Sequence, residues 1–360
     1  MLQLTPGRSE GAMPDCTAEL RKILKKAEQE QSLTKEELLF LLTLEREEEA
    51  ELLFRTAREL RERYFQNEVF LYGFIYFSTW CRNDCAFCYY RRSNRIPHRY
   101  RKSDEEILEA AERLAESGVH LIDLTSGEDE DNYSRPGAFE RIASLAREIK
   151  KRLNVAVMLS PGVVPKSALQ LFAASGADWY ACYQETHNPQ LYERLRLHQG
   201  FEERLQAKLF ARSCGMLVEE GILKGVGETY ADVVDSFGFM RSLGAQQVRV
   251  MSFIPQKGTP MEHSATPDRL EELKVIAVMR ILFPDRLIPA SLDVDGIDGL
   301  EARLRAGANV ITSLIPPKLG LAGVAQSARD IEEGYRTVQG VIPVLEKLGM
   351  APAAKDRYLK

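Results

Sequence analysis

The sequence is short of the residues from which most metal sites and disulfide frameworks are built. Its 360 residues include six cysteines and five histidines. Three of the cysteines lie between residues 81 and 88, while Cys16, Cys182 and Cys214 are scattered. A disulfide framework needs paired cysteines and an oxidising compartment. We therefore expect a protein of the reducing cytoplasm, in which the scattered cysteines are ordinary buried or surface thiols.

Other absences exclude further classes of protein. No run approaches 18 uncharged apolar residues, so no transmembrane helix is expected. Residues 1–16 are polar and lack the basic-then-apolar order of a signal peptide. The net charge of −5, with no appended RNA-binding segment, argues against an RNA-modifying enzyme. We expect neither a membrane nor a nucleic acid as a partner.

Apolar residues make up 44% of the chain, which is enough for a full core. From residue 69 onward, short apolar runs of β type alternate with amphipathic helical stretches. The eight expected strands are Phe70–Thr79, Leu121–Thr125, Val155–Ser160, Asp178–Gln184, Leu217–Gly225, Gln247–Phe253, Leu287–Asp293 and Asn309–Leu314. Eight β/α alternations over about 250 residues predict an α/β fold, a (β/α)8 barrel of the TIM type.

Helical patterns flank the expected barrel on both sides. Before it, residues 34–37 have the composition of a capping box and precede leucines on a helical period. After it, residues 328–348 form a final helical pattern. The predicted organisation is an N-terminal helical extension over residues 1–66, a barrel over residues 67–326 and a C-terminal helical segment over residues 327–360.

The grouped cysteines, Cys81, Cys85 and Cys88, have the spacing C-x3-C-x2-C and follow the first expected strand. Thiolates bind zinc, copper(I) or iron–sulfur clusters, and three from one loop can hold three corners of a cubane. A structural zinc ion or an ordinary cubane has four protein ligands, but the next candidate along the chain is His98. Three ligands would leave one iron open for a substrate or cofactor. A zinc site with a distant fourth ligand and three unconnected thiols remain alternatives.

Three charged residues fall inside otherwise apolar strands: Asp123, Arg249 and Asp293. Such charges are costly unless they are paired or used on a ligand. In a (β/α)8 barrel, the chemistry sits at the carboxyl ends of the strands. These residues are therefore candidates for the active site. The alternative is an internal Arg249–Asp293 ion pair that stabilises the mouth of the barrel.

The cysteine pattern, with Phe87 directly before its last cysteine, is typical of the radical S-adenosylmethionine (SAM) enzymes. Within that superfamily the chain resembles the methylornithine synthase family, which rearranges lysine in pyrrolysine biosynthesis. The resemblance runs from about residue 35 to residue 350 and rests on Tyr76–Thr79, Cys85–Tyr90, Asp123–Asp129, Tyr183–Thr186, Gly221–Gly227, Val248–Met251, Arg286–Asp293 and Gly296–Gly299. Biotin synthase and the hydrogenase-maturation barrel proteins are similar by motif, but are not expected to share Arg249, Ser291 and Asp293 together.

The resemblance implies two cofactors. The three cysteines would hold a [4Fe–4S] cluster whose open iron is chelated by SAM. Ser126 and Arg204 would hold the methionine part of SAM, and Glu185 would accept hydrogen bonds from the ribose hydroxyls, as the chemistry of these side chains allows. Gly225 and Gly227 would permit a close backbone approach to adenine. A surface position for Arg204 and a capping role for Ser126 are the alternatives.

The resemblance also implies an isomerase that converts L-lysine to (3R)-3-methyl-D-ornithine. A 5′-deoxyadenosyl radical would abstract hydrogen from lysine, whose side chain fragments and recombines. Lysine carries two ammonium groups and one carboxylate, so Arg249, Asp123 and Asp293, with Ser291 as a neutral partner, are complementary to it. Each charge-assisted hydrogen bond contributes about 1.5–3 kcal/mol, and a full set would fix both ends of the substrate.

We call residues 79–90, which contain the three grouped cysteines, the cysteine loop. A basic run follows it and consists of Arg91, Arg92, Arg95, Arg99, Arg101 and Lys102. One interpretation is a solvated loop. The other is a surface that steers an acidic electron donor, such as a flavodoxin or a ferredoxin, towards the cluster.

Two other functions remain open. The first is a radical SAM enzyme of the biotin-synthase or hydrogenase-maturation type with a different substrate. The second is a non-catalytic sensor that uses the cysteines to bind a metal or to respond to redox conditions. An anaerobic preparation separates them, because a brown protein that cleaves SAM is an enzyme and a colourless zinc protein is not.

Overall fold

The computed structural model describes residues 16–358 of the chain. Residues 1–15 of the expected N-terminal extension, residues 359–360 and the side chain of Cys16 lie outside the described residues. Eight parallel strands form one sheet in the order β6-β5-β4-β3-β2-β1-β8-β7. A backbone bridge between Gln247 and Leu287 joins the two edges, so that the sheet nearly closes. The strands are β1 (Glu68–Ser78), β2 (Leu121–Ser126), β3 (Ala156–Ser160), β4 (Trp179–Ala181), β5 (Leu217–Lys224), β6 (Gln247–Ser252), β7 (Pro289–Ser291) and β8 (Val310–Leu314). The expected α/β barrel is confirmed.

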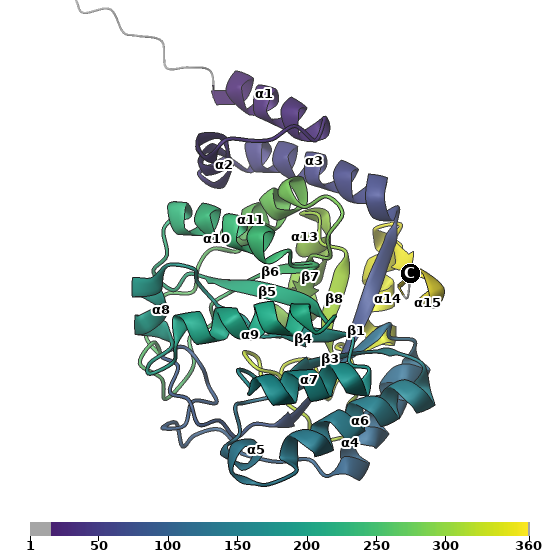
Figure 1. Ribbon diagram of the computed structural model, residues 1–360. Coiled ribbons are helices and arrows are strands. Elements are labelled where there is room, and N and C mark those ends of the chain that lie inside the picture. Colours follow the sequence, from purple (N-terminus) through teal and green to yellow (C-terminus); the bar gives the residue numbers. More distant parts are fainter. Residues whose placement is uncertain (1–15, 359–360) are drawn as a thin grey trace, which may run out of the picture.

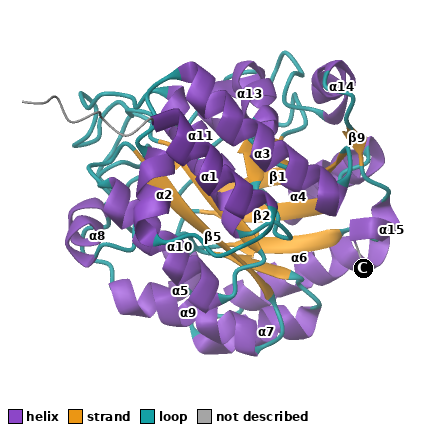
Figure 2. Cartoon of the chain, turned by 90° about the horizontal axis from the view of Figure 1, so that it is seen from above, coloured by secondary structure: helices purple, strands orange, loops and turns teal. Residues whose placement is uncertain are grey.

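Helices between successive strands cover the outside of the sheet (Figures 1 and 2). Three of these helices end at a glycine with a left-handed backbone conformation: Gly118, Gly176 and Gly244. This ending is expected where a glycine directly follows a helical pattern in the sequence. The helices of this layer are α4 (Asp104–Ser117), α6 (Ala138–Leu153), α7 (Lys166–Ser175), α9 (Phe201–Ser213), α10 (Tyr230–Leu243) and α11 (Arg269–Leu282). Shorter helices lie in the connections: α5 (Glu130–Ser134), α8 (Pro189–Leu195), α12 (Leu292–Asp295), η1 (Gly296–Gly299) and α13 (Leu300–Arg305).

The N-terminal extension consists of α1 (Cys16–Glu28), α2 (Lys35–Leu42) and α3 (Glu47–Phe65), at the top of Figure 1. Thr34 and Glu37 form the expected capping box at the start of α2. These helices lie against α10 and α11. Leu20, Leu41 and Leu53 are buried in the same hydrophobic cluster as the outer helices of the barrel. The extension is therefore packed continuously onto the barrel.

Three expected elements differ from the structure. The fourth strand, expected over Asp178–Gln184, is β4 and ends at Ala181. The seventh strand ends at Ser291, whose side chain accepts from the backbone N–H of Asp293 and caps α12. Asp293 thus lies in a helix and not in a strand. The final helix, expected over residues 328–348, is α14 (Val338–Lys347), and turns occupy residues 328–337. Arg336 in this stretch is buried and contacts the Asp293 carboxylate, a tertiary contact that local pattern does not indicate.

The C-terminal residues cover the end of the barrel at which the strands begin. Strand β9 (Ala351–Pro352) pairs with the start of β1, and α15 (Lys355–Tyr358) follows it. The Tyr358 hydroxyl lies 2.6 Å from that of Tyr72, and its ring contacts Phe70. Inward side chains of neighbouring strands, such as Met158 and Trp179, complete this cluster. It forms a floor beneath the carboxyl halves of the strands.

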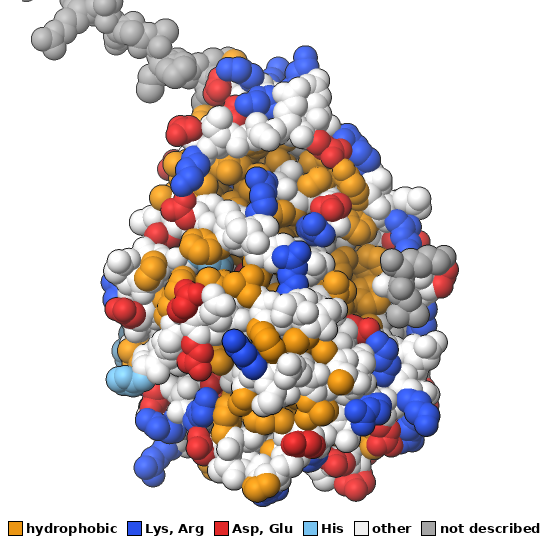
Figure 3. All heavy atoms as spheres, viewed as in Figure 1, with side chains coloured by type: hydrophobic (Ala, Val, Ile, Leu, Met, Phe, Trp, Pro, Cys, Tyr) orange, Lys and Arg blue, Asp and Glu red, His pale blue; other side chains and the backbone are white. Residues whose placement is uncertain are grey.

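None of the helices within residues 16–358 has both the length and the apolar character needed to cross a bilayer. On the face seen in Figure 3, Lys and Arg side chains are interspersed with Asp and Glu, and apolar side chains show between them.

A buried ion pair joins α11 to α13. Arg303 donates from Nε and Nη2 to the two carboxylate oxygens of Glu272, at 2.6 and 2.8 Å, and both residues are 1% exposed. Asp295 and Ser252 make further hydrogen bonds to the pair. Because Arg303 and Glu272 are both desolvated, removing one charge leaves the other buried without its main partner.

We expect Arg303→Met to lower the free energy of unfolding by about 3–5 kcal/mol, measured by urea denaturation. Arg305→Met is the matched control, because Arg305 forms an exposed i,i+4 pair with Glu301 and should cost no more than about 0.5 kcal/mol. The double variant Arg303→Met, Glu272→Leu should recover part of the loss. Equal effects of the two single variants would contradict the assignment.

Candidate active site

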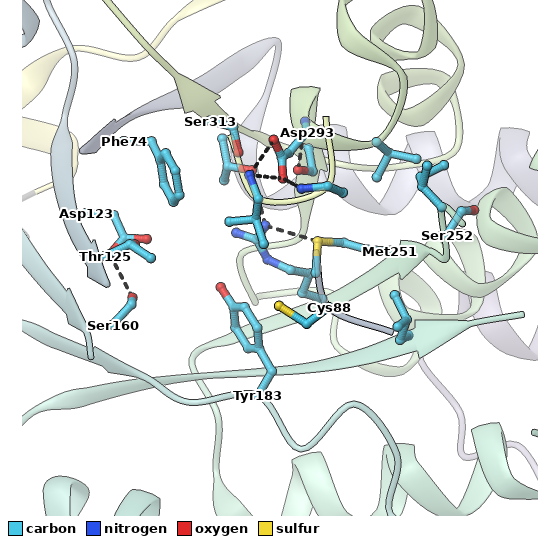
Figure 4. A pocket seen from close by; sticks show the side chains of 18 of the residues that line it. Phe74, Cys88, Asp123, Thr125, Ser160, Tyr183, Met251, Ser252, Asp293 and Ser313 are labelled. Atoms are coloured by element: carbon cyan, nitrogen blue, oxygen red, sulfur yellow. Dashed lines mark hydrogen bonds between the residues drawn. The ribbon is translucent and has the colours of Figure 1, made fainter. Parts of the chain in front are cut away.

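A cavity of about 1010 Å³ opens among the carboxyl ends of the strands. Cys88 of the cysteine loop and side chains from β2, β5, β6 and the residues after β7 surround it (Figure 4). The expected site residues that line it are Cys88, Asp123, Glu185, Arg249, Ser291 and Asp293. Ser126 and Arg204 are not among its lining residues. The structure therefore places the expected substrate residues and one cluster cysteine in the same cavity.

The cysteine loop is held in place by backbone hydrogen bonds to three separate elements. The N–H of Thr79 donates to Tyr100 O at 3.1 Å, that of Arg82 to Glu128 O at 2.8 Å, and that of Ala86 to Leu195 O at 2.7 Å. Gly127 makes the approach to β2 possible, since a Cβ there would lie 2.3 Å from the carbonyl oxygen of Trp80. The loop is thus fixed before any cofactor binds.

The basic run after the cysteines is only partly solvated: Arg91 is buried, Arg99 and Lys102 are half-buried, and the other three arginines are exposed. Arg99 donates to four backbone carbonyl oxygens between residues 79 and 94, including Tyr90 O at 2.9 Å and Arg91 O at 2.7 Å. Arg101 binds both oxygens of Asp129, at 2.7 and 2.8 Å. Arg92, Arg95 and Arg101 are exposed, and Arg92 Nη2 donates to Asp84 Oδ2 at 3.1 Å.

The three thiols fit a multi-iron cluster. All are free, and Cys85 is buried while Cys81 and Cys88 are half-buried. Among the described residues no three Cys, His, Asp or Glu side chains converge on a point that one metal ion could occupy, whereas a cubane takes each thiolate at a different iron. Burial raises the pKa of Cys81 to about 11 and also raises the pKa of Cys88. A bound metal must therefore displace protons from these thiols.

Buried polar atoms without partners lie near the thiols, as expected where a polar cofactor binds. They are Thr125 Oγ1 and Ser126 Oγ at the end of β2, and Glu185 Oε2 after β4. Glu185 has a φ of +67°, which is strained for a residue with a side chain. Burial raises the pKa of Glu185, and Arg196 opposes this by donating to its Oε1 at 2.6 Å. A hydroxyl-rich ligand such as a ribose would satisfy the free Oε2.

Arg204 is buried, but its guanidinium is bound by other side chains. It donates from Nη2 to Glu128 Oε1 and to Gln199 Oε1, both at 2.9 Å. Burial alone would raise the pKa of Glu128, but Arg204 and neighbouring donors hold it below its ordinary value. Arg204 and Glu128 line a second cavity of about 780 Å³. A surface position for Arg204 is thereby excluded.

An ion pair inside the barrel sets the charge of the main cavity. Arg249 Nε donates to Glu219 Oε1 at 2.5 Å, and Tyr183 donates to Glu219 Oε2 at 2.8 Å. Burial alone would lower the pKa of Arg249, but Glu219 raises it, so the guanidinium stays charged. Nη1 contacts Thr312 at 3.3 Å, and within the described chain Nη2 makes no hydrogen bond. Nη2 is therefore free to bind an anionic ligand.

Asp123 lies across the same cavity (Figure 4). Its Oδ1 accepts from Ser160 Oγ at 2.7 Å. Burial, together with the negative charge of Glu219, raises the pKa of Asp123 to about 7. The carboxyl group is thus held near its point of ionisation, and a cation that enters the cavity will favour its charged form.

Asp293 is committed to contacts within the chain. Its carboxylate accepts from the backbone N–H groups of Val324 and Ala325, at 2.9 and 2.7 Å, and from Arg336 Nη2 at 3.0 Å. Residues 319–327, which we call the mouth segment, are thereby held beside the cavity. The expected alternative of an Arg249–Asp293 ion pair is wrong, since Arg249 pairs with Glu219 and Asp293 with Arg336.

Sequence reasoning missed several residues of the site. Glu219 is fully buried in an apolar strand, and the criterion that selected Asp123 would have found it. Arg196 and Gln199 contact Cys85 from the end of α8 and the turn after it, where no sequence pattern indicates a role. Arg336 lies in a stretch that was expected to be helical and gave no signal.

Comparisons with known proteins agree with this geometry. The profile of the Radical SAM superfamily matches residues 75–240. The 3-methylornithine synthase of Methanosarcina acetivorans is 46% identical over 326 residues, which cover 91% of this chain and 92% of that protein. The crystal structure of methylornithine synthase (PylB) superposes with a TM-score of 0.88 at 43% identity and covers 94% of this chain and 99% of that one.

A hydrogenase maturase also resembles the chain, at lower identity. The [FeFe] hydrogenase maturase subunit HydE of Thermotoga maritima is 37% identical over 294 residues, 81% of this chain and 82% of that protein. Enzymes of the radical SAM superfamily use a [4Fe–4S] cluster and SAM, and the free thiols and unpartnered polar atoms of this site fit both. With 46% identity along nine-tenths of its length, the chain belongs to the 3-methylornithine synthase family of the radical SAM superfamily.

Proposed function

We propose that this enzyme rearranges L-lysine to (3R)-3-methyl-D-ornithine, the first step of pyrrolysine biosynthesis. The observation that carries the proposal is a single cavity in which Cys88 of the cysteine loop faces a guanidinium with a free Nη2 and a carboxyl group poised to ionise. Arg249 and Asp123 supply these two groups on different strands. The family supplies the reaction type, and these residues suit a zwitterionic amino acid.

For the substrate, we propose that Arg249 binds the lysine carboxylate through Nη2 and that Asp123 binds an ammonium group. Ser291, at the end of β7, lines the cavity as a neutral hydrogen-bonding partner. Asp293 already accepts from three donors. We therefore propose that Asp293 places its negative charge near the second ammonium group while it holds the mouth segment. The segment would exclude water from the substrate.

For the cofactors, we propose that Cys81, Cys85 and Cys88 ligate the [4Fe–4S] cluster. Glu185 Oε2 and Ser126 Oγ would satisfy hydroxyl and amino groups of SAM. Arg204 would bind the carboxylate of SAM if Glu128 released it. When bound, the two cofactors supply a 5′-deoxyadenosyl radical that removes a hydrogen atom from the substrate. Together, these side chains would orient SAM and lysine relative to each other.

Product analysis of the reconstituted enzyme tests the proposal. Under anaerobic conditions with SAM, reductant and L-lysine, we expect a new amino acid of the same mass as lysine, resolved by chromatography and identified by its fragmentation. Arg249→Lys should keep the ion pair with Glu219 but lose the guanidinium Nη2 that is proposed to bind the lysine carboxylate. We expect it to lower product formation by about 10- to 100-fold. SAM binding, measured by calorimetry, should be unchanged.

Arg241→Lys is the matched control, because Arg241 is exposed on α10. SAM cleavage without a lysine isomer would contradict the proposed substrate and favour a maturase-like reaction, such as the 37% identity to HydE suggests. A colourless zinc protein that leaves SAM intact would contradict the enzyme assignment.

The raised pKa of Asp123 predicts pH-dependent lysine binding. An ammonium group requires the ionised carboxylate, so affinity is full above the pKa of about 7 and is lost as the pH falls through it. Between pH 8 and pH 6 the affinity for lysine should fall by about tenfold, measured by anaerobic calorimetry. Asp123→Asn should bind weakly with a flat profile. Ser160→Ala should shift the fall to higher pH, because the Ser160 hydroxyl lowers the pKa of Asp123. An unchanged slope in Asp123→Asn would contradict this assignment.

We also propose an acidic flavodoxin or ferredoxin as the electron donor. The exposed Arg92 and Arg95 directly follow the cysteine loop and would steer such a protein towards it. Trp80, next to Cys81 in the sequence, is 44% exposed and offers an apolar contact, with the Arg101 guanidinium 5.1 Å from the centre of its ring. Arg91, Arg99 and Arg101 hold carbonyl or carboxylate groups around the cysteines in place. Arg92 reaches Asp84 at 3.1 Å but keeps 68% of its side chain exposed, so Arg92 and Arg95 are the better residues for a test.

Charge reversal of these two residues should slow cluster reduction by flavodoxin. We expect Arg92→Glu with Arg95→Glu to lower the bimolecular rate by about tenfold at low ionic strength and to weaken its salt dependence, measured by stopped-flow absorbance. Photoreduction by 5-deazariboflavin, a neutral small molecule, is the control and should be unaffected. A salt-independent rate in the unmodified enzyme would contradict the steering role.

A further inference from the structure

Two side chains donate hydrogen bonds to one thiol of the cysteine loop. Gln199 Nε2 lies 3.1 Å from Cys85 Sγ, and Arg196 Nη1 lies 3.6 Å from the same sulfur. Both donors follow α8, whose last carbonyl, Leu195 O, accepts from Ala86 N at 2.7 Å. Cys85 is 6% exposed. The end of α8 therefore contacts the backbone and the sulfur of the loop together.

The same guanidinium also contacts Glu185 of the expected SAM site. Arg196 Nη2 donates to Glu185 Oε1 at 2.6 Å and to Tyr183 O at 3.1 Å. Its Cζ lies 5.5 Å from the centre of the Phe87 ring, which stands between Cys85 and Cys88 in the sequence and lines the main cavity. Arg196 is 9% exposed, so these partners fix its orientation.

We propose that Arg196 is a positioning residue with two effects. Through Nη2 it orients Glu185 so that the free Oε2 of this carboxylate can accept from the ribose of SAM. Through Nη1, together with Gln199, it raises the reduction potential of a cluster ligated by Cys85. The first effect rests on the proposed SAM site, while the second requires only that Cys85 ligates the cluster.

The electrostatic reason for the second effect is the charge balance of reduction. One electron from an external reductant adds one negative charge to the thiolate-bound cluster, and no bond is made or broken. N–H donors and a nearby guanidinium stabilise that added charge, and hydrogen bonds to ligand sulfurs are known to set cluster potentials. The guanidinium is buried, so water screens its charge weakly. Removal of the guanidinium should make the cluster harder to reduce.

The test is an EPR-monitored redox titration of the reconstituted full-length enzyme with dithionite, in the absence of SAM and lysine. Arg196→Gln should shift the midpoint potential to a more negative value. In a separate calorimetric titration the same variant should bind SAM with roughly tenfold lower affinity. Arg194→Gln is the matched control, since Arg194 is exposed on α8 and removes the same charge. It should change neither quantity.

Iron content and thermal midpoint are measured first, because Arg196→Gln removes buried contacts. If this variant does not take up a cluster, Gln199→Met decides, since it removes the shorter donor to Cys85 and should also lower the potential. A potential equal to that of the unmodified enzyme, in a variant with a full cluster, would overturn the effect at Cys85. Unchanged SAM affinity in Arg196→Gln would overturn the effect at Glu185. Neither result depends on turnover of lysine, so failure here and failure of the proposed reaction are distinguishable.

Discussion

The ion pair between Arg249 and Glu219 lies inside the barrel, where Glu219 is fully buried and Arg249 is 7% exposed. Two desolvated charges are tolerated only when both are partnered, and Tyr183 and Thr312 supply the additional hydrogen bonds. The bond to Glu219 uses Nε of Arg249, and within the described residues Nη2 has no hydrogen-bond partner. The negative charge of Glu219 adds to the effect of burial and raises the pKa of Asp123. The polarity of the substrate cavity depends on this one contact.

The chain separates the two halves of the site. The cysteine loop, Glu185 and Arg196 belong to the first four strands and their connections, and the Radical SAM profile covers them within residues 75–240. Arg249 and Ser291 come from later strands, outside that range, whereas Asp123 on β2 lies within it. A barrel allows this division because the carboxyl ends of all strands converge at one mouth.

The fold was predictable because its signals are local. Apolar runs, helical periods and terminal glycines placed all eight strands, and a costly charge in an apolar strand pointed to Asp123 and Arg249. Partner choice was not predictable, because it depends on which elements meet in space. Arg249 pairs with Glu219 from the neighbouring strand, while Asp293 pairs with Arg336 from a distant turn. For the same reason the arginines after the cysteines looked like surface charge, although most of them bind carbonyls or carboxylates of the site.

The mouth segment shows how closely backbone and charge are matched beside the cavity. Val324 and Ala325 present two successive N–H groups to the Asp293 carboxylate. The chain can approach so closely only because residue 323 is glycine, since a Cβ there would lie 2.2 Å from Asp293 Oδ1. Tyr90, on the cysteine loop, donates to Gly323 O at 3.3 Å. The segment thus joins the cysteine loop to the substrate half of the cavity. Because a reactive radical must be kept from solvent, a segment that contacts both the cysteine loop and Asp293 is well placed to shield the cavity.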